Sequence, residues 1–497
     1  MLRYIVALLA GASLTLAYAP FGLWPIVFIA VPLVIILLQR IEPRRQFLFS
    51  WLFGLGWFGA GISWVHVSIA DFGGLPLIAS MALMFLLCGY LALFPAAALN
   101  LIANRFPTSM WPLALPVAWT LFEWLRSWLL TGFPWLSIGY SQIDSPLSGW
   151  MPVIGETGVS ALVMMLCAGI AVWLPQRKWL AVLTVSFTAF FSGFVLNTVS
   201  WTEPGGEQVN VAMVQGNIRQ ELRWAPEQDM PTMQKYLDLT QSLWDNDLII
   251  WPEAAIPRLE SLSQDYLQEL DDLAAKKDTG LITGIVNYNF ETRQVFNNLI
   301  TLGKRHADDD AGHYQYLHDN RFAKHHLLPI GEFIPLEDWL RGIAPLFDLP
   351  MSSFTRGAFR QPNLVANSVH LTPAICFEIA FPRQVGANID QHTDAIITVS
   401  NDAWFGRSHG PAQHLEIARV RAKEFGLPVL RATNNGITAF INEKGDVVAR
   451  LPQFQAGSIE HTVEKVTGST PYRRFGDTII WLVMLCLTIE CWRASRR

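Results

Sequence analysis

A cysteine, a glutamate and a lysine occupy distinctive positions in the more polar part of this chain. Cys376 lies in the stretch Pro-Ala-Ile-Cys-Phe-Glu, Glu253 directly follows Trp-Pro, and Lys324 ends Arg-Phe-Ala-Lys. Cys376 has no disulfide partner in its region, because the other four cysteines lie in long apolar runs. A lone thiol is either an inert buried group or a nucleophile. The glutamate and the lysine favour the nucleophile, and the three residues together predict acyl transfer through a thioester.

Each of the three side chains has a distinct part in that chemistry. A free thiol has a pKa of about 8.5, so it needs a base or a nearby cation to ionise at neutral pH. Glu253 can take the thiol proton. Lys324 can lower the thiol pKa and, with the backbone N–H of Phe377, hold the oxyanion of a tetrahedral intermediate. The alternative is a surface ion pair of Glu253 and Lys324, and the position of the glutamate after Trp-Pro disfavours it.

Two of these residues, and an Asn-Asp pair, come at the ends of short β-branched runs. Glu253 ends the run 248–253, Cys376 ends the run 371–376, and Asn401 and Asp402 follow the run 395–400. Layered α/β folds place catalytic groups at the carboxyl ends of their strands, where the next loop supplies backbone N–H donors. We therefore expect these strand ends to converge on one edge.

The region 202–477 has the pattern of an α/β domain. Short β-branched runs alternate with helical periodicity and with Pro, Gly and Asn clusters. The pattern predicts a layered domain with strands at 209–214, 248–251, 281–286, 299–302, 369–375, 395–400, 429–441 and 458–463, and helices at 228–244, 261–275 and 411–425.

The composition outside this region points to a membrane. The 497 residues are 51% hydrophobic and only 15% charged, against about 25% charged residues in a typical soluble protein. Charged residues are rare up to about residue 200, and 478–492 is apolar again. The net charge of −5 and the lack of a basic stripe exclude nucleic-acid binding.

The apolar segments predict a polytopic α-helical membrane protein of about eight transmembrane helices. A bilayer core about 30 Å thick needs about 20 apolar residues in a helix. We expect a membrane domain at 1–200, an extracytoplasmic catalytic domain at 202–477, and a last helix with a cytoplasmic tail at 478–497. The candidate spans are 4–19, 24–38, 47–67, 75–102, 113–130, 151–174, 180–195 and 478–492.

The cations between these spans predict the orientation. Lys and Arg lie at alternate ends of successive spans, and the intervening loops 20–22, 71–74 and 131–149 contain none. The positive-inside rule therefore places both termini in the cytoplasm and the region 202–477 outside, in the periplasm of a Gram-negative cell. Arg473 and Arg474 are a local exception of the kind that long translocated domains tolerate.

Three features of the membrane part have two interpretations each. Residues 1–19 are either a retained first span or a cleavable signal peptide, and the further spans favour retention because they need no separate export signal. Glu123 and Arg126, three residues apart on one helix, are either functional or a neutralising ion pair. The aromatic-rich loop 132–140 is either an interfacial anchor or part of a lipid entrance.

The motifs around the three reactive residues resemble a known superfamily. Trp-Pro-Glu253, Lys324 with Glu332 eight residues later, and Cys376-Phe-Glu378 are similar to the Glu-Lys-Cys triad of the nitrilase, or carbon–nitrogen hydrolase, superfamily. With spans on both sides of this region, the whole chain resembles the apolipoprotein N-acyltransferase family. Further matches are Val-Gln-Gly-Asn at 214–217, Ser-Asn-Asp-Ala-Trp-Phe-Gly at 400–406, Arg-Ala-Thr-Asn-Asn-Gly at 431–436 and Thr-Pro-Tyr-Arg-Arg-Phe-Gly-Asp at 470–477.

The resemblance implies a fold, a reaction and a location. The soluble region would be a nitrilase-like α-β-β-α sandwich inserted in a multi-pass protein of the bacterial inner membrane. An acyl chain would move from a membrane phospholipid, phosphatidylethanolamine in the family, to Cys376 and then to the α-amine of the N-terminal S-diacylglyceryl cysteine of an apolipoprotein. No cofactor and no metal are implied.

The resemblance also indicates supporting residues. Glu332 would position Lys324 or the incoming amine, whereas Glu378 is as readily structural. Trp224, Asn401, Trp404 and Phe405 are candidates for substrate binding, with core packing as the alternative for the aromatic residues. We expect structural roles for His325, His326 and His414, since their spacing does not suit zinc.

Two other classes of function fit parts of the sequence. A membrane-tethered amidase or nitrilase would use the same triad with water and a small substrate, but one span suffices for a tether. A transporter with an extracytoplasmic sensing domain would need paired polar groups or broken helices in its spans, and few are present.

Overall fold

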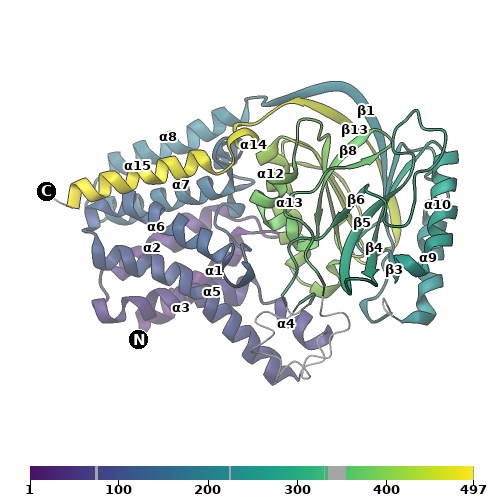
Figure 1. Ribbon diagram of the computed structural model, residues 1–497. Helices are drawn as coiled ribbons and strands as arrows, with labels where there is room; N and C mark the ends of the chain where they lie inside the picture. Colours follow the sequence, from purple (N-terminus) through teal and green to yellow (C-terminus); the bar gives the residue numbers. More distant parts are fainter. Residues whose placement is uncertain (73–75, 223–224, 330, 334–353, 496–497) are drawn as a thin grey trace. The chain divides into compact units, whose positions relative to one another are not determined.

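The computed structural model describes residues 1–72, 76–222, 225–329, 331–333 and 354–495. The chain divides into two compact units (Figure 1). One is helical and consists of Met1–Ala70, Leu75–Trp201 and Thr470–Arg497. The other is an α/β unit formed mainly by Thr202–Ser469.

The helical unit is built from apolar helices. Among the described residues, three are long and apolar enough to cross a membrane: Leu77–Arg105, Pro146–Trp173 and Trp179–Asn197. The last helix of the chain packs against α6 (Trp111–Arg126) and α7 (Met151–Trp173), far earlier in the sequence (Figure 1). The helices are α1 Leu2–Ser13, α2 Val27–Leu38, α3 Pro43–Gly61, α4 Val65–Val67, α5 Leu77–Arg105, α6 Trp111–Arg126, α7 Met151–Trp173, α8 Trp179–Asn197, α14 Pro471–Phe475 and α15 Thr478–Ser495.

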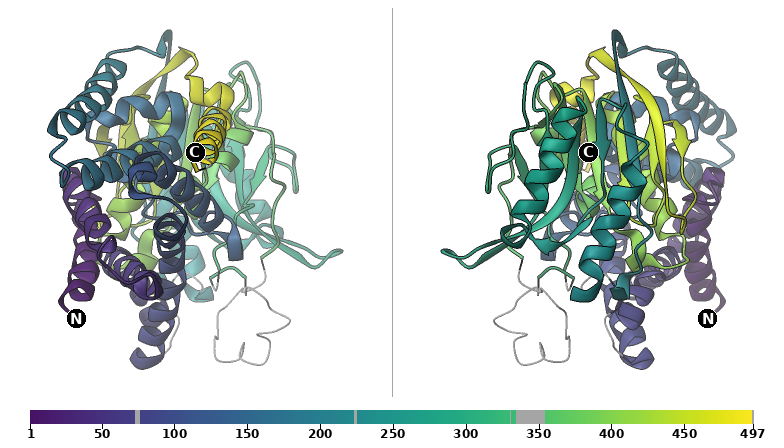
Figure 2. Two further views of the ribbon diagram at one scale, coloured as in Figure 1. Left: turned by 90° about the vertical axis from the view of Figure 1, so that its left-hand side faces the viewer. Right: turned by 90° about the vertical axis from the view of Figure 1, so that its right-hand side faces the viewer.

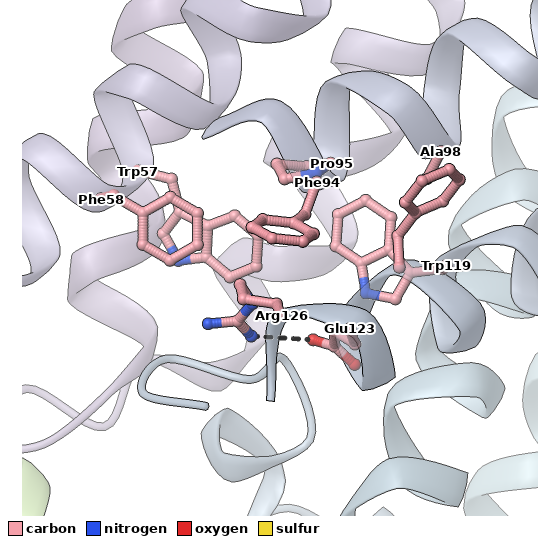
Figure 3. A pocket seen from close by; sticks show the side chains of 9 residues that line it. Trp57, Phe58, Phe94, Pro95, Ala98, Trp119, Glu123 and Arg126 are labelled. Atoms are coloured by element: carbon pink, nitrogen blue, oxygen red, sulfur yellow. Dashed lines mark ion pairs between the residues drawn. The ribbon is translucent and has the colours of Figure 1, made fainter. Parts of the chain in front are cut away.

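Two charged side chains of α6 hold the loop 132–140 inside this unit. Arg126 Nη2 lies 3.7 Å from Glu123 Oε1, beside aromatic side chains that line the same pocket (Figure 3). Arg126 donates to the carbonyl oxygens of Phe133 and Trp135 at 2.9 and 2.6 Å. The backbone N–H of Ile138 donates to Glu123 Oε1 at 3.1 Å. The ion pair is therefore internal, and it supplies hydrogen-bond partners for the non-helical backbone of the loop.

The same loop is buried rather than displayed. Trp135 and Tyr140 are each 1% exposed, and the Tyr18 hydroxyl donates to the carbonyl oxygen of Leu136 at 2.9 Å. Aromatic anchors of a membrane interface keep their rings in contact with lipid headgroups. Burial of these two rings inside the protein therefore speaks against the anchoring interpretation of the loop.

The α/β unit contains two sheets. In the first, the strands lie in the order β13-β1-β2-β4-β5-β6 with β3 paired to β4, and in the second the order is β12-β11-β10-β9-β8-β7. The first sheet comprises β1 Thr202–Gln215, β2 Leu248–Ile250, β3 Ile256–Leu259, β4 Gly280–Asn289, β5 Gln294–Gly303, β6 Arg321–Ala323 and β13 Gly457–Gly468. The second comprises β7 Leu364–Ala366, β8 Val369–Ile375, β9 Ala395–Ser400, β10 Val429–Thr433, β11 Ala439–Ile441 and β12 Val447–Arg450.

The layers follow from the alternation of side chains along the strands. Ile397 and Val399 of β9 join an apolar core with Val211 and Met213 of β1, between the two sheets. The outer faces are covered by helices: α9 (Pro226–Thr240) and α10 (Gln264–Lys276) pack on the first sheet, and α12 (Pro382–Asn388) and α13 (Gly410–Phe425) on the second. The two pairs lie on opposite sides in Figure 1, and the right-hand view of Figure 2 looks onto α9 and α10. This arrangement is an α-β-β-α sandwich.

Most predicted strands and helices of this unit are present, with two kinds of difference. The run 429–441, predicted as one strand, is the hairpin β10–β11, because Asn434, Asn435 and Gly436 interrupt it. Four strands of three or four residues were not predicted: β3, β6, β7 and β12.

Candidate active site

Cys376 lies at a sharp bend between a strand and a helical turn. It directly follows β8 and opens the 3₁₀ turn Cys376–Ala380. Its φ of +56° falls in the left-handed region that residues other than glycine rarely adopt. Such backbone strain is common at active sites. Cys376 is 9% exposed, and it lies beside the end of β9, the parallel neighbour of β8.

Glu253 reaches the same place from the first sheet. Trp251 closes the β2 pairing, with its N–H donating to the carbonyl oxygen of Ile282 at 2.8 Å, and Pro252 then removes the next donor. The Glu253 carboxylate accepts hydrogen bonds from Asn297 Nδ2 at 2.8 Å and from the backbone N–H of Asn401 at 3.1 Å. The strand ends that carry Glu253 and Asn401 therefore meet, as the sequence predicts.

Lys324 lies between two carboxylates. Its Nζ is 2.8 Å from Glu332 Oε2 and 3.6 Å from Glu253 Oε1. Asn297 links the two acids, since its Nδ2 also donates to Glu332 Oε1 at 3.0 Å. The backbone N–H of Lys324 donates to the carbonyl oxygen of Asn297 at 2.8 Å. The lysine is 2% exposed. Its backbone is fixed by Asn297, and its ammonium group is fixed by the two carboxylates.

The electrostatics of Lys324 keep it protonated. Burial alone lowers the pKa of an amine, but the charges of Glu332 and Glu253 outweigh it, and the pKa of Lys324 is raised above its ordinary value. The site therefore holds a cation whose charge acts on the Cys376 sulfur.

The sulfur itself is a neutral thiol at rest. Burial, followed by the charge of Glu253, raises the pKa of Cys376 to about 12, against the lowering effect of Lys324. A thiol with this pKa is almost entirely protonated at neutral pH. The thiol needs a base to become a nucleophile. The Glu253 carboxylate lies close enough for its charge to raise the thiol pKa, and it is the candidate base.

Glu378 connects the two loops that carry Lys324 and Cys376. Its Oε1 accepts hydrogen bonds from the backbone N–H groups of His325 and His326 at 2.8 and 2.9 Å, and its Oε2 accepts from the N–H of Ile375 at 2.8 Å. The side chain is fully buried, and burial raises its pKa against these hydrogen bonds. Glu378 therefore braces the site rather than facing solvent.

Replacing Glu378 by glutamine should destabilise this part of the fold. In the glutamine variant the side-chain NH₂ group would face at least one backbone N–H that the carboxylate accepts from in the wild-type protein. We therefore expect Glu378→Gln to lower the unfolding free energy by about 2–3 kcal/mol. Denaturant unfolding followed by tryptophan fluorescence measures it. Glu269→Gln, on the exposed face of α10, is the matched control. Equal stability of the two variants would contradict the bracing role.

The other candidates differ in where they lie. The Asn401 side chain accepts from Asn434 Nδ2 at 2.9 Å and donates to Gln220 Oε1 at 2.6 Å, so it ties loops together beside Glu253. Trp404 and Phe405 lie in the 3₁₀ turn Asp402–Phe405 and are partly exposed. Trp224 lies outside the described residues.

The histidines near the site make protein contacts. His325 Nδ1 is 2.7 Å from the carbonyl oxygen of Gly357, and the His326 ring stacks on Phe381 at 3.4 Å between centroids. In the described part of the chain, no group of three or more His, Cys, Asp or Glu side chains is placed to hold a metal ion.

Asn297 and Ser400 were not predicted as site residues, whereas Asp402 was expected at this edge. Asn297 bridges the two acids, and its position in the buried strand β5 was a usable signal, because asparagine is disfavoured there. Ser400 and Asp402 lie behind the sulfur, with the Ser400 hydroxyl 3.5 Å from Cys376 Sγ and 2.6 Å from Asp402 Oδ1. Only the pairing of β8 with β9 brings them there.

Comparison with known proteins agrees with this architecture. Residues 10–169 match the family of apolipoprotein N-acyltransferase N-terminal domains, and residues 210–472 match the carbon–nitrogen hydrolase family. An apolipoprotein N-acyltransferase from Vibrio cholerae is 45% identical over 502 residues, covering 100% of this chain and 98% of the relative. The chain belongs to the apolipoprotein N-acyltransferase family. Another apolipoprotein N-acyltransferase, from Shewanella oneidensis, is 46% identical over 492 residues, covering 98% of this chain and 94% of the relative.

Membership in the apolipoprotein N-acyltransferase family confirms the resemblance drawn from the triad motifs. The α/β unit is a nitrilase-like domain, and the membrane-tethered amidase is not favoured. Among solved structures, a carbon–nitrogen hydrolase from Helicobacter pylori G27 is similar to this chain, with 13% identity, a TM-score of 0.39, and coverage of 56% of this chain and 94% of that chain.

Proposed function

We propose that this member of the family acylates lipoproteins in two half-reactions through a thioester on Cys376. The acyl chain comes from a membrane phospholipid, with phosphatidylethanolamine as the proposed donor. The acceptor is the α-amine of the N-terminal S-diacylglyceryl cysteine of an apolipoprotein. The observation that carries the proposal is the grouping of Cys376, Glu253 and Lys324 at one edge of the sandwich.

In the first half-reaction Glu253 takes the proton of the Cys376 thiol as the sulfur attacks the ester carbonyl. Lys324 and the backbone N–H of Phe377 stabilise the oxyanion that forms. Collapse of the tetrahedral intermediate breaks the ester bond, and the proton held by Glu253 passes to the leaving alkoxide. The products are a lysophospholipid and the acyl-thioester.

In the second half-reaction the acceptor amine attacks the thioester. An α-amine has a pKa of about 7.7–8.0, so it arrives largely protonated and must lose a proton before attack. The ammonium form loses one proton to solvent. As the neutral amine attacks, Glu253 in its carboxylate form accepts the second proton from the nitrogen and passes it to the sulfur, which leaves as the carbon–sulfur bond breaks. The N-acylated lipoprotein is released.

The proposed membrane topology suits these substrates. Both carry acyl chains that are costly to move into water. We propose about eight membrane-spanning helices, a periplasmic catalytic domain and cytoplasmic termini in the bacterial inner membrane. Three long apolar helices and the alternating cations support this topology.

Trapping of the acyl-enzyme tests the proposed function. Incubation with phosphatidylethanolamine labelled in its acyl chains should transfer label to the protein, and hydroxylamine should release it, as expected for a thioester. Addition of a diacylglyceryl peptide should move the label to the amine of the peptide. Release of the label as free fatty acid, with no transfer to the peptide, would instead support a hydrolase.

Glu332 provides a separate prediction, because it makes the shorter of the two carboxylate contacts to Lys324. We expect Glu332→Gln to slow both half-reactions by about tenfold, since loss of one charge-assisted hydrogen bond leaves the lysine less well held. Single-turnover rates of acylation and of transfer measure the two steps. Normal acylation with an accumulating acyl-enzyme would place Glu332 with the incoming amine instead.

A further inference from the structure

A buried polar network lies behind the Cys376 sulfur, and the two half-reactions leave it unused. Ser400 ends β9, the parallel neighbour of β8, and is fully buried. Its hydroxyl oxygen lies 3.5 Å from Cys376 Sγ and 2.6 Å from Asp402 Oδ1. Ser400 therefore connects the sulfur to a buried carboxylate.

Asp402 is held as a fixed acceptor. Arg431 Nη2 donates to its Oδ2 at 2.7 Å, and His414 Nδ1 lies 3.1 Å from its Oδ1. The other ring nitrogen of His414 lies 3.1 Å from the carbonyl oxygen of Cys376. Burial raises the pKa of Asp402, but Arg431 and His414 outweigh it and hold the pKa below its usual range. Asp402 is therefore ionised at neutral pH.

The Ser400 hydroxyl has one proton for two partners. A short O–H···O⁻ contact is the stronger of the two, so at rest the proton points to Asp402 and the oxygen lone pairs face the sulfur. The Cys376 thiol can then donate its S–H to Ser400. Once the thiol proton is gone, the sulfur only accepts, and the same hydroxyl can turn toward it while Arg431 and His414 still satisfy Asp402.

We propose that Ser400 is a reversible hydrogen-bond partner of the nucleophile, accepting from the Cys376 thiol and donating to the thiolate, with Asp402 as the positioning residue. No covalent bond forms or breaks in this step, since the hydroxyl rotates and keeps its proton. The inference rests on the proposed role of Cys376 as the nucleophile.

The role of Ser400 is distinct from those of the charged groups that face the sulfur. Glu253 and Asp402 favour the thiol, and Lys324 favours the thiolate. Ser400 is the uncharged neighbour that stabilises the thiolate when it forms. Its removal should therefore shift the ionisation of Cys376 without changing the charge of the site.

Alkylation of the full-length protein tests this inference. The rate at which iodoacetamide modifies Cys376 is measured at several pH values by mass spectrometry of the peptide that contains it. We expect Ser400→Ala to be about tenfold slower at every pH below the thiol pKa, which corresponds to a pKa raised by about one unit. Thr398→Val is the matched control, because it removes a buried hydroxyl two residues earlier on β9 that has no hydrogen-bond partner among the described residues. It should alkylate at the wild-type rate.

A second measurement separates ionisation from access of the reagent. The S–H stretching band of Cys376 is obtained as the infrared difference between the protein and its Cys376→Ala variant. In Ser400→Ala the band should move to higher frequency, because the thiol has lost its acceptor. Unchanged alkylation rates, or an unchanged band, in Ser400→Ala would overturn the inference. Neither readout requires turnover, so both test Ser400 independently of the reaction. An error in the assignment of the nucleophile would appear in a different measurement, as lipoprotein acylation by the Cys376→Ala variant.

Discussion

Cys376→Ala is expected to abolish acyl-enzyme formation and lipoprotein acylation, to below about one ten-thousandth of the wild-type rate. The sulfur is the atom that would carry the acyl group, and Cys376 is the only cysteine in the sequence between residues 202 and 469. The change removes one atom from a buried site, so the fold should persist. Retention of labelled acyl chains after incubation with phosphatidylethanolamine measures the first half-reaction directly.

The other cysteines provide the control. Cys88 and Cys167 are buried in α5 and α7 of the helical unit, where thiols act as small apolar groups. Their alanine variants should acylate nearly as fast as the wild-type protein, and so should those of Cys486 and Cys491 on α15. A hydroxylamine-sensitive acyl group that persisted in Cys376→Ala would show that the nucleophile lies elsewhere.

Glu253→Gln should slow acylation by about 10²–10⁴-fold, because an amide cannot take the thiol proton. The effect is large here because burial raises the pKa of Cys376 to about 12, so very little thiolate exists without a base. Single-turnover acylation with labelled phospholipid is the measurement.

Glu332→Gln is the matched control for this prediction. Both changes remove one negative charge from the surroundings of Lys324, and Glu332 is the nearer of the two, at 2.8 Å against 3.6 Å. If the acids acted only through the charge of the lysine, Glu332→Gln would be the more damaging change. A base role for Glu253 requires the reverse order in the acylation step. Equal or inverted effects on acylation would remove Glu253 as the base.

Local sequence was sufficient to predict the main features of the α/β unit. The β-branched runs that end at Glu253 and Cys376 are strand ends in the structure. A short apolar run and the proline or polar residue that follows it are properties of a few adjacent residues. The chemistry of a lone thiol with an acid and a lysine was also available from residue types alone. The same local patterns did not reveal β6 and β7, which contain at most one β-branched residue each.

Only the tertiary structure decided how the site is held. Asn297 reaches Glu253 across 44 residues of sequence, and Glu378 reaches the N–H of His325 across 53. In the helical unit, Arg126 donates to the carbonyl oxygens of Phe133 and Trp135, whereas its spacing from Glu123 left a functional pair and a neutralising ion pair as alternatives. These hydrogen bonds join residues that are distant in the sequence. A buried donor or acceptor has no water to bind, so it pairs with whichever polar group the fold places beside it. The same exclusion of water raises the pKa of Cys376 and so determines the protonation state of the thiol. The spacing of residues along the chain does not predict this state.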